Sequence, residues 1–358
     1  MQKPGKNVVY YIKWEVLFIM SAKKERILWM DIAKGLAMFL VCWGHENVDP
    51  IPNNWIYSFH MPLFFMLSGM TFAFNKETNA AKYIKKKAKG LLIPYVFLNI
   101  IVIPLSYIDG AITGEHIQSI PEFLLGILIS QKGSGFLMPS NTTWFIATLF
   151  ITDIVFFLFW KILKKDRFIF IALPVFSFLC YALGLMNPPG GSPWHVKTVA
   201  TSVIFYMVGY FFLKYISSLK EFLKERSFLI ILICILFAGG IWFELHNGRV
   251  SMIANYYSDM AYFYISALSS SVAFVLLIML LSESEKVVSV LKFADIIGKN
   301  TLPYIAFQVP VMRIMKHAIP FFGQENEAAR LIMSLVFYFA FIPASIYIQK
   351  IIPARKKK

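Results

Sequence analysis

Ten runs of apolar residues, each close to the length that crosses a bilayer, constrain this chain more than any other feature. A transmembrane helix needs roughly 20 mainly apolar residues, and few soluble folds could bury a chain that is 58% hydrophobic and 17% aromatic. The sequence therefore predicts an all-α polytopic membrane protein with about ten transmembrane helices. The expected spans lie near 27–44, 55–74, 91–108, 142–160, 168–187, 198–213, 227–245, 261–282, 300–319 and 331–349.

The distribution of basic residues predicts the orientation of these spans. Of the 35 lysines and arginines, 28 fall on the side of the N-terminus, six fall on the other side, and Lys34 lies within the first span. Cytoplasmic loops carry such an excess, so we expect both termini in the cytoplasm. The formal charge of +15 is then explained by this orientation bias and by contacts of the basic residues with anionic membrane lipids. It requires no nucleic-acid partner.

No loop is long enough for a soluble domain and no internal repeat is visible, so we expect one membrane domain over residues 27–350. A cytoplasmic or interfacial segment, 1–26, precedes it, and a basic cytoplasmic tail, 351–358, follows. Val8 to Met20 is apolar, contains charges and is too short to span a bilayer, which is typical of an interfacial segment. Translation could start at Met20, which would leave the first span intact.

Three segments are expected on the outer side. The longest, 109–141, contains an apolar patch, 120–129, that is too short to span and is predicted to be re-entrant or interfacial. The other two, 187–195 and 246–259, contain Asn, Ser, Tyr and Trp side chains. Such side chains could bind a sugar, or they could anchor the protein at the membrane interface, and the sequence leaves both open.

Asp31, Lys34 and His45 form one polar stripe on the first span. Eleven residues separate Lys34 from His45, which is close to three helical turns, so both should lie on the same helix face. Asp31 and Lys34 are three residues apart and can form an ion pair. Ionisable groups at membrane depth are costly and usually carry function.

His45 and His60 are the candidate catalytic residues at the outer end. A neutral histidine can take a proton from a hydroxyl, and Glu46 or Asp49 could orient the ring; alternatively, His45 only caps the first helix. His60 opens the second span across a short loop, so we expect it close to His45. Two histidines do not complete a metal site, and no metal is predicted.

The segment Lys82 to Gly90 contains five lysines and is expected to be an inner loop ahead of the third span. Lys86, Lys87 and Lys89 could hold the phosphates of a nucleotide-like donor. The positive-inside bias predicts the same cluster, so the lysines alone do not establish a donor site.

The three cysteines, Cys42, Cys180 and Cys234, lie far apart in expected spans and predict neither a disulfide framework nor a metal site. Cys42 lies three residues before His45. An acyl-thiol intermediate is therefore conceivable, although a packing role is favoured.

Several of these motifs resemble the acyltransferase 3 family of integral-membrane acyltransferases, and the resemblance covers nearly the whole chain. Its most specific part is a basic residue followed after ten residues by a histidine, filled here by Lys34 and His45. The motifs are Asp31-Ile32-Ala33-Lys34-Gly35 with Gly44-His45, the run Phe59 to Phe65 with Leu67-Ser68-Gly69, the run Leu91 to Tyr95, the segment Asn141 to Ile146, the run Phe205 to Tyr210, and Gly298 to Tyr304.

The resemblance implies ten transmembrane helices in a bacterial plasma membrane. It also implies transfer of an acyl group, usually acetyl from cytosolic acetyl-CoA, to a hydroxyl of an envelope glycan or its lipid-linked precursor. By this likeness His45 is the catalytic histidine and Lys34 is its basic partner. His60, Asn141 and Trp144 would line the acceptor or acyl path, and the glycan-biosynthesis machinery would be a partner.

The chain departs from the family pattern at two places. The family often has arginines where this chain has Lys86, Lys87 and Lys89, and lysine lacks the bidentate fork of arginine. The motif that begins at Gly298 commonly leads to a histidine where this chain has Gln308, which cannot act as a base. A glycan transporter is the rival interpretation, but the paired broken helices expected of a transporter are not visible. The acceptor sugar, the acyl group and the oligomeric state stay open.

Overall fold

The computed structural model describes residues 27–46, 50–131, 138–186, 191–219, 223, 225–324 and 326–353. Within these residues the chain is helical, and an isolated antiparallel bridge joins Ser251 and Tyr256. The predicted N-terminal segment with its two candidate starts, Asp49, and most of the basic tail lie outside the described residues.

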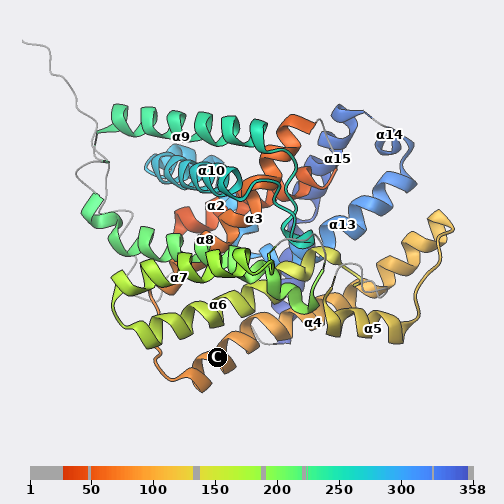
Figure 1. Cartoon of the computed structure of the whole chain (residues 1–358). Coiled ribbons are helices and arrows are strands. Elements are labelled where there is room, and N and C mark those ends of the chain that lie inside the picture. Colours follow the sequence, from red (N-terminus) through yellow and green to blue (C-terminus); the bar gives the residue numbers. More distant parts are fainter. Residues whose placement is uncertain are drawn as a thin grey trace, which may run out of the picture.

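The helices follow one another along the chain with short connections, as Figure 1 shows. The α-helices are α2 (Leu28–Gly44), α3 (Pro50–Phe72), α4 (Ala80–Thr113), α5 (Ile120–Ile129), α6 (Trp144–Leu163), α7 (Asp166–Ala182), α8 (Val196–Tyr215), α9 (Arg226–Asn247), α10 (Met260–Leu281), α11 (Glu285–Val290), α12 (Lys292–Lys299), α13 (Thr301–Ala318), α14 (Pro320–Gly323), α15 (Glu327–Ala340) and α16 (Ile342–Ile351). The 3-10 helices are η2 (Asn141–Thr143), η3 (Pro193–His195), η4 (Ile216–Leu219) and η5 (Met252–Ala254).

Each of the ten expected spans coincides with a helix or, for the last one, with a bent pair. By length and apolarity, five helices are suited to cross a membrane: α4, η2 with α6, η3 with α8 and η4, α9, and α10. A sixth span results if α15 and α16, which meet at a 48° bend, count as one. The chain is thus an all-α, multi-pass membrane protein, while the number of ten spans and the cytoplasmic location of the termini stay predictions.

The prediction of a loop over residues 82–90, ahead of the third span, is wrong. Residues 82–90 form the first turns of α4, which runs for 34 residues. The helix begins early because the Asn79 side chain caps it and accepts a hydrogen bond from the backbone of Lys82. Lysine and alanine are also good helix formers. The basic cluster is therefore a helical surface.

Large apolar side chains cover the outside of several helices. The exposed fractions reach 65% for Phe178 on α7 and 62% for Ile235 on α9. Such continuous apolar surface is unusual for a protein surrounded by water, and it is what a helix needs where it faces lipid. Further exposed members are Phe168, Phe170, Ile171, Val175 and Leu179 on α7, and Phe228, Ile230, Ile231 and Trp242 on α9.

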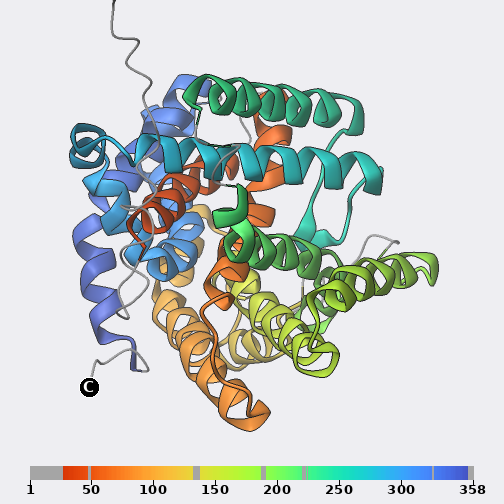
Figure 2. The same ribbon diagram turned by 90° about the vertical axis from the view of Figure 1, so that its left-hand side faces the viewer.

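Helices α2 and α3 occupy the centre of the molecule. α3 packs against α2, α8, α9 and α10, and Figures 1 and 2 show α9 and α10 lying side by side over it. Glycines allow the closest approach: a Cβ atom on Gly69 of α3 would lie 1.9 Å from the carbonyl oxygen of Tyr206 on α8. Small residues of this kind let membrane helices touch backbone to backbone.

Candidate active site

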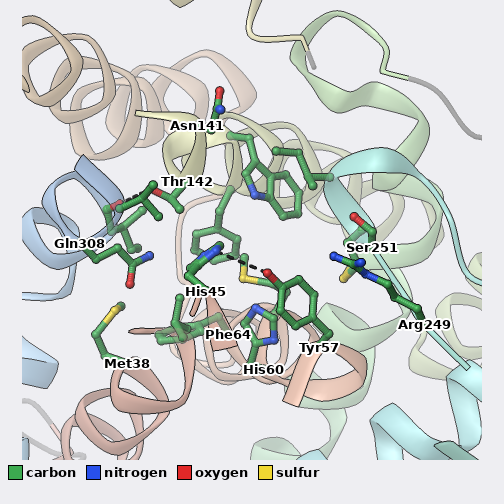
Figure 3. Close-up of a pocket in the computed structure, with 18 residues that line it drawn as sticks. Met38, His45, Tyr57, His60, Phe64, Asn141, Thr142, Arg249, Ser251 and Gln308 are labelled. Atoms are coloured by element: carbon green, nitrogen blue, oxygen red, sulfur yellow. Dashed lines mark hydrogen bonds between the residues drawn. The ribbon is translucent and has the colours of Figure 1, made fainter. Parts of the chain in front are cut away.

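A cavity of about 270 Å³ lies where α2, α3, η2, α6 and α13 meet the segment between α9 and α10. Figure 3 shows its side chains converging from these elements. Four of the residues singled out from the sequence, His45, His60, Asn141 and Trp144, line this one cavity. The other lining residues are Met38, Val41, Tyr57, Met61, Phe64, Thr142, Phe145, Arg249, Ser251, Met252, Ile253, Ile305, Gln308 and Val309.

His45 is the C-cap residue of α2, directly after the expected first span. Its Nδ1 atom lies 3.4 Å from the hydroxyl oxygen of Tyr57, and Figure 3 shows the two side chains facing each other. Burial lowers the pKa of the His45 imidazole to about 4. The ring is therefore neutral at pH 7, the form that a general base requires. Its partner is a hydroxyl, where the sequence had suggested a carboxylate from Glu46 or Asp49.

His60 stands one helical turn after Ile56 on α3, and its Nδ1 lies 2.6 Å from the Ile56 carbonyl oxygen. A carbonyl can only accept a hydrogen bond, so Nδ1 carries the proton and the neutral ring keeps its lone pair on Nε2. The Tyr57 ring packs edge-on against both histidines, with centroids 5.2 Å from His60 and 6.1 Å from His45. The two histidines, which the sequence predicts to be close together, are therefore linked by the Tyr57 ring, which contacts both of them.

Asn141 and Thr142 lie at the top of the cavity in Figure 3, and Trp144 lines the same cavity. They lie on η2 and the first turn of α6. The Thr142 hydroxyl donates a hydrogen bond to the Ile305 carbonyl, which ties η2 to α13. Trp144 is buried and contacts the His195 ring, with centroids 5.4 Å apart. This segment therefore contributes an aromatic wall to the cavity that His45 and His60 line.

Gln308 of α13 lines the cavity and is fully buried. Its Oε1 accepts a hydrogen bond from the thiol of Cys42 at 3.3 Å. Its Nε2 has no hydrogen-bond partner among the described residues, and Figure 3 shows this nitrogen on the side of His45. A buried amide donor without a partner is costly, so this N–H is available to a bound ligand. Cys42 itself does not line the cavity, which agrees with a packing role.

Tyr57 and Arg249 are lining residues that no sequence motif indicates. Arg249 belongs to the segment between α9 and α10, and it is exposed. Its guanidinium gives the cavity a positive charge at its rim. Neither residue belongs to a recognisable spacing pattern, so the only signal was the position of each near an expected helix end.

Lys34 and Asp31 lie at the other end of α2. Their side chains are paired, with Lys34 Nζ 3.5 Å from Asp31 Oδ1. Eleven residues of helix separate Lys34 from His45 by about 16 Å along the axis, so the two cannot touch. Neither Asp31 nor Lys34 lines the cavity. The structure thus places the two ends of the polar stripe in different environments.

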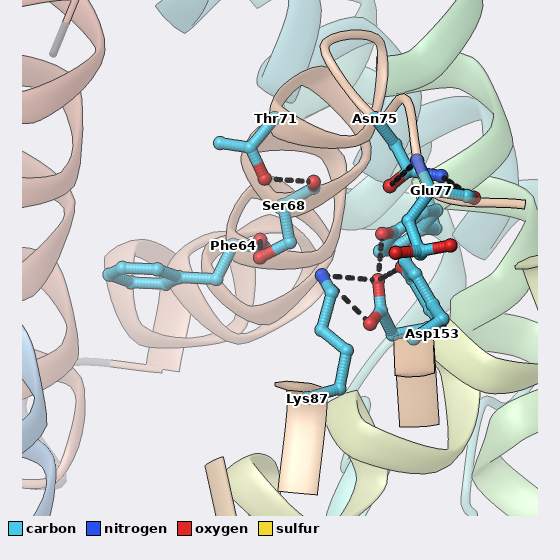
Figure 4. Close-up of polar contacts among 9 residues, drawn as sticks. Phe64, Ser68, Thr71, Asn75, Glu77, Lys87 and Asp153 are labelled. Carbon is cyan, nitrogen blue, oxygen red and sulfur yellow. Dashed lines mark hydrogen bonds and ion pairs between the residues drawn. The ribbon is translucent and has the colours of Figure 1, made fainter. Parts of the chain in front are cut away.

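The three candidate donor-binding lysines on α4 also differ from one another. Lys87 forms an ion pair with the buried carboxylate of Asp153 at 2.8 Å, as Figure 4 shows. Tyr83 donates to the same carboxylate at 2.9 Å, and Tyr206 donates to it as well. Lys87 therefore serves this buried network, whereas Lys86 and Lys89 are exposed. The described residues contain no group of three potential metal ligands.

The chain matches a known protein family. The sequence model of the acyltransferase 3 family, an acyltransferase domain, matches residues 27–349, which is nearly the whole chain and includes every element that lines the cavity. A search among curated proteins found no match. Because the family match spans well over half of the sequence, the chain belongs to the acyltransferase 3 family of membrane acyltransferases.

Proposed function

We propose that the protein transfers acetyl from acetyl-CoA to a hydroxyl of a cell-envelope or exported polysaccharide, or of its lipid-linked precursor. The family match supports acyl transfer. The observation that carries the proposal is the pairing of His45 with Tyr57 in the wall of the cavity. A neutral, oriented imidazole is the group that such a reaction needs to activate a hydroxyl.

In this proposal His45 is the general base. Its ring proton lies on Nδ1 and is donated to the Tyr57 oxygen, so that Nε2 accepts the proton of the acceptor hydroxyl. The acceptor oxygen then bonds to the thioester carbonyl carbon and the carbon–sulfur bond breaks. The proton passes from Nε2 to the departing CoA sulfur, which leaves an O-acetyl ester, CoA as a free thiol and neutral His45.

Gln308 is suited to stabilise the oxygen of the acyl group. Negative charge develops on this oxygen as the tetrahedral intermediate forms, and a donor that is already in place lowers the barrier. The unpartnered Nε2 of Gln308 is such a donor on the wall of the cavity. The bond from Cys42 holds the amide oxygen away and thereby leaves the nitrogen for the substrate.

The donor would approach from the end of α2 that carries Lys34. The exposed lysines of α4, Lys86 and Lys89, could attract the phosphates of CoA by charge. Lys34 lies about three turns from His45, so its role would concern the acyl-bearing arm of the donor and not proton transfer. His60 and Trp144 would line the path of the acyl group and the acceptor.

The test uses purified protein in nanodiscs with radiolabelled acetyl-CoA and a bacterial lipid extract, following CoA release and transfer of label to the extract. We expect His45→Ala to reduce transfer by roughly 10²–10⁴-fold, the usual contribution of a general base. His317→Ala, which changes an exposed histidine at the end of α13 outside the cavity, is the matched control. Glycan movement across reconstituted vesicles without any CoA release would instead establish the transporter interpretation.

A further inference from the structure

A second cavity of about 150 Å³ adjoins the first one. It lies between the C-terminal part of α4, the segment leading into α5, and α13. Asn141 and Val309 line both cavities, so the two share a wall. The volume is below the roughly 300–1,000 Å³ of a site for a complete drug-sized ligand, and it suits one ring or headgroup of a larger molecule.

The polar groups of the second cavity are centred on Asp109, which is only 9% exposed. Its Oδ2 lies 2.9 Å from Nε of Arg313. Its Oδ1 has no hydrogen-bond partner among the described residues. A carboxylate oxygen that is buried without a donor is costly, and a hydroxyl of a ligand would satisfy it.

The charges around Asp109 favour a neutral ligand. Arg313 also forms an ion pair with Glu115, so one guanidinium already faces two carboxylates. An additional phosphate would add to this excess of negative charge, whereas a hydroxyl group can donate to a carboxylate without adding any charge. Phe123 supplies an apolar ring in the same cavity, as the C–H face of a sugar requires.

We propose that this second cavity is the acceptor subsite, in which Asp109 binds hydroxyls of an uncharged sugar ring while another hydroxyl of the same molecule reaches His45 past Asn141. The proposal rests on the acyl-transfer function proposed above and adds to it the location of the acceptor and the absence of charge on its sugar ring. Asp109 is a binding residue here and takes no part in proton transfer.

The experiment measures acetyl transfer from radiolabelled acetyl-CoA to methyl β-D-glucopyranoside, methyl α-D-mannopyranoside and methyl N-acetyl-β-D-glucosaminide at increasing concentration. For the glycoside used best, we expect Asp109→Asn to raise KM at least tenfold and to change kcat much less. Ser106→Leu, which narrows the same cavity and removes no charge, should also raise KM. The matched control is Glu283→Gln, another carboxylate bonded to an arginine, which lines neither cavity.

Binding is measured separately by saturation-transfer NMR of the same glycosides without acetyl-CoA, with inorganic phosphate as competitor. We expect a glycoside signal that both Asp109→Asn and Ser106→Leu weaken and that phosphate leaves unchanged. Displacement by phosphate, or a KM and a signal that neither variant alters, would overturn the subsite. If CoA release depends on His45 while Asp109→Asn changes neither KM nor the glycoside signal, acyl transfer stands without this subsite. If the glycosides bind through Asp109 and CoA is never released, the subsite stands and acyl transfer fails.

Discussion

A Cβ atom on Gly298 would lie 1.7 Å from the backbone carbonyl oxygen of Asp31. Helices α12 and α2 therefore meet backbone to backbone at this point, and a second contact of the same kind follows at Gly35, where a Cβ atom would lie 2.0 Å from the carbonyl oxygen of Ala294. The motif that begins at Asp31 and the motif that begins at Gly298 are almost 270 residues apart in the sequence, and they pack directly against each other. Because His45 follows directly after the last residue of α2, this contact holds the helix that positions the candidate base.

Gly298→Ala should destabilise the protein by separating α12 from α2. Overpacking of a tight contact costs about 1–3 kcal/mol, and here the obstacle is backbone that cannot rotate away. We expect a lower midpoint of thermal unfolding and a lower yield of folded protein. The matched control is Gly239→Ala on α9, where a Cβ atom meets nothing within 4 Å, so that alanine should be neutral or stabilising. Equal midpoints for the two variants would contradict the close contact.

The helical architecture and part of the site are predictable from the sequence for physical reasons. Long apolar runs can only be helices in a bilayer, and the sequence correctly places His45 and His60 near each other, since both line one cavity. The prediction that His60 opens the second helix is wrong, because α3 already begins at Pro50 and His60 lies in its middle. The sequence predicts a loop at the start of α4 because a run of lysines is typical of loops in composition. Lysine is nevertheless a good helix former, and the Asn79 side chain caps the helix at this point.

The rest of the site depends on tertiary contacts that no local pattern encodes. Tyr57 is one of 17 tyrosines, and only the approach of α3 to the end of α2 makes it the partner of His45. Gln308 is distinguished by its contact with Cys42, 266 residues away in sequence. Lys87 could not be separated from its neighbours in the basic cluster, because only the packing of α4 against α6 brings it to Asp153.

Tyr57→Phe should slow acyl transfer by removing the hydroxyl that holds the His45 ring. A hydrogen bond contributes about 0.5–1.5 kcal/mol net, so we expect kcat to fall by up to about tenfold with little change in KM for acetyl-CoA. Tyr215→Phe is the control. Tyr215 is the last residue of α8, and its hydroxyl donates a hydrogen bond to Asp166 of α7, outside the cavity. Loss of acetyl-CoA affinity with unchanged kcat would show that Tyr57 binds the donor and does not orient His45.

The pH dependence of activity should reflect the burial of His45. Its pKa is lowered to about 4, so the neutral form that acts as base persists from pH 8 down to about pH 5. We expect kcat/KM to stay level over this range and to fall only as the pH approaches 4. Circular dichroism at each pH serves as the folding control. The unfolded chain takes up a proton at His45 more readily than the folded protein does, so the folded protein loses stability as the pH drops from 6.5 towards 4. A loss of activity with a midpoint near 6.5 in folded protein would show that His45 is solvated.

Cys42→Ala tests the acyl-thiol alternative. Cys42 is fully buried and its thiol is bonded to Gln308, so direct transfer from CoA to the acceptor should not require it. We expect the variant to keep acyl transfer within about tenfold of the wild type, since only the orientation of one amide is lost. Complete loss of transfer together with a trapped acyl-protein in the wild type, absent from Cys42→Ala, would establish a thioester intermediate.

Gln308→Leu should affect the chemical step more strongly than the binding of either substrate. If Nε2 donates to the acyl oxygen in the transition state, its removal should lower kcat by roughly 10²–10³-fold, as for other donors to a developing oxyanion. KM for acetyl-CoA should change little, because this bond strengthens only as charge develops. Gln349→Leu on α16, which changes a glutamine outside the cavity, is the control. Single-turnover measurements separate the chemical step from product release. If Gln308→Leu keeps the wild-type single-turnover rate, the Gln308 amide has only a structural role beside Cys42.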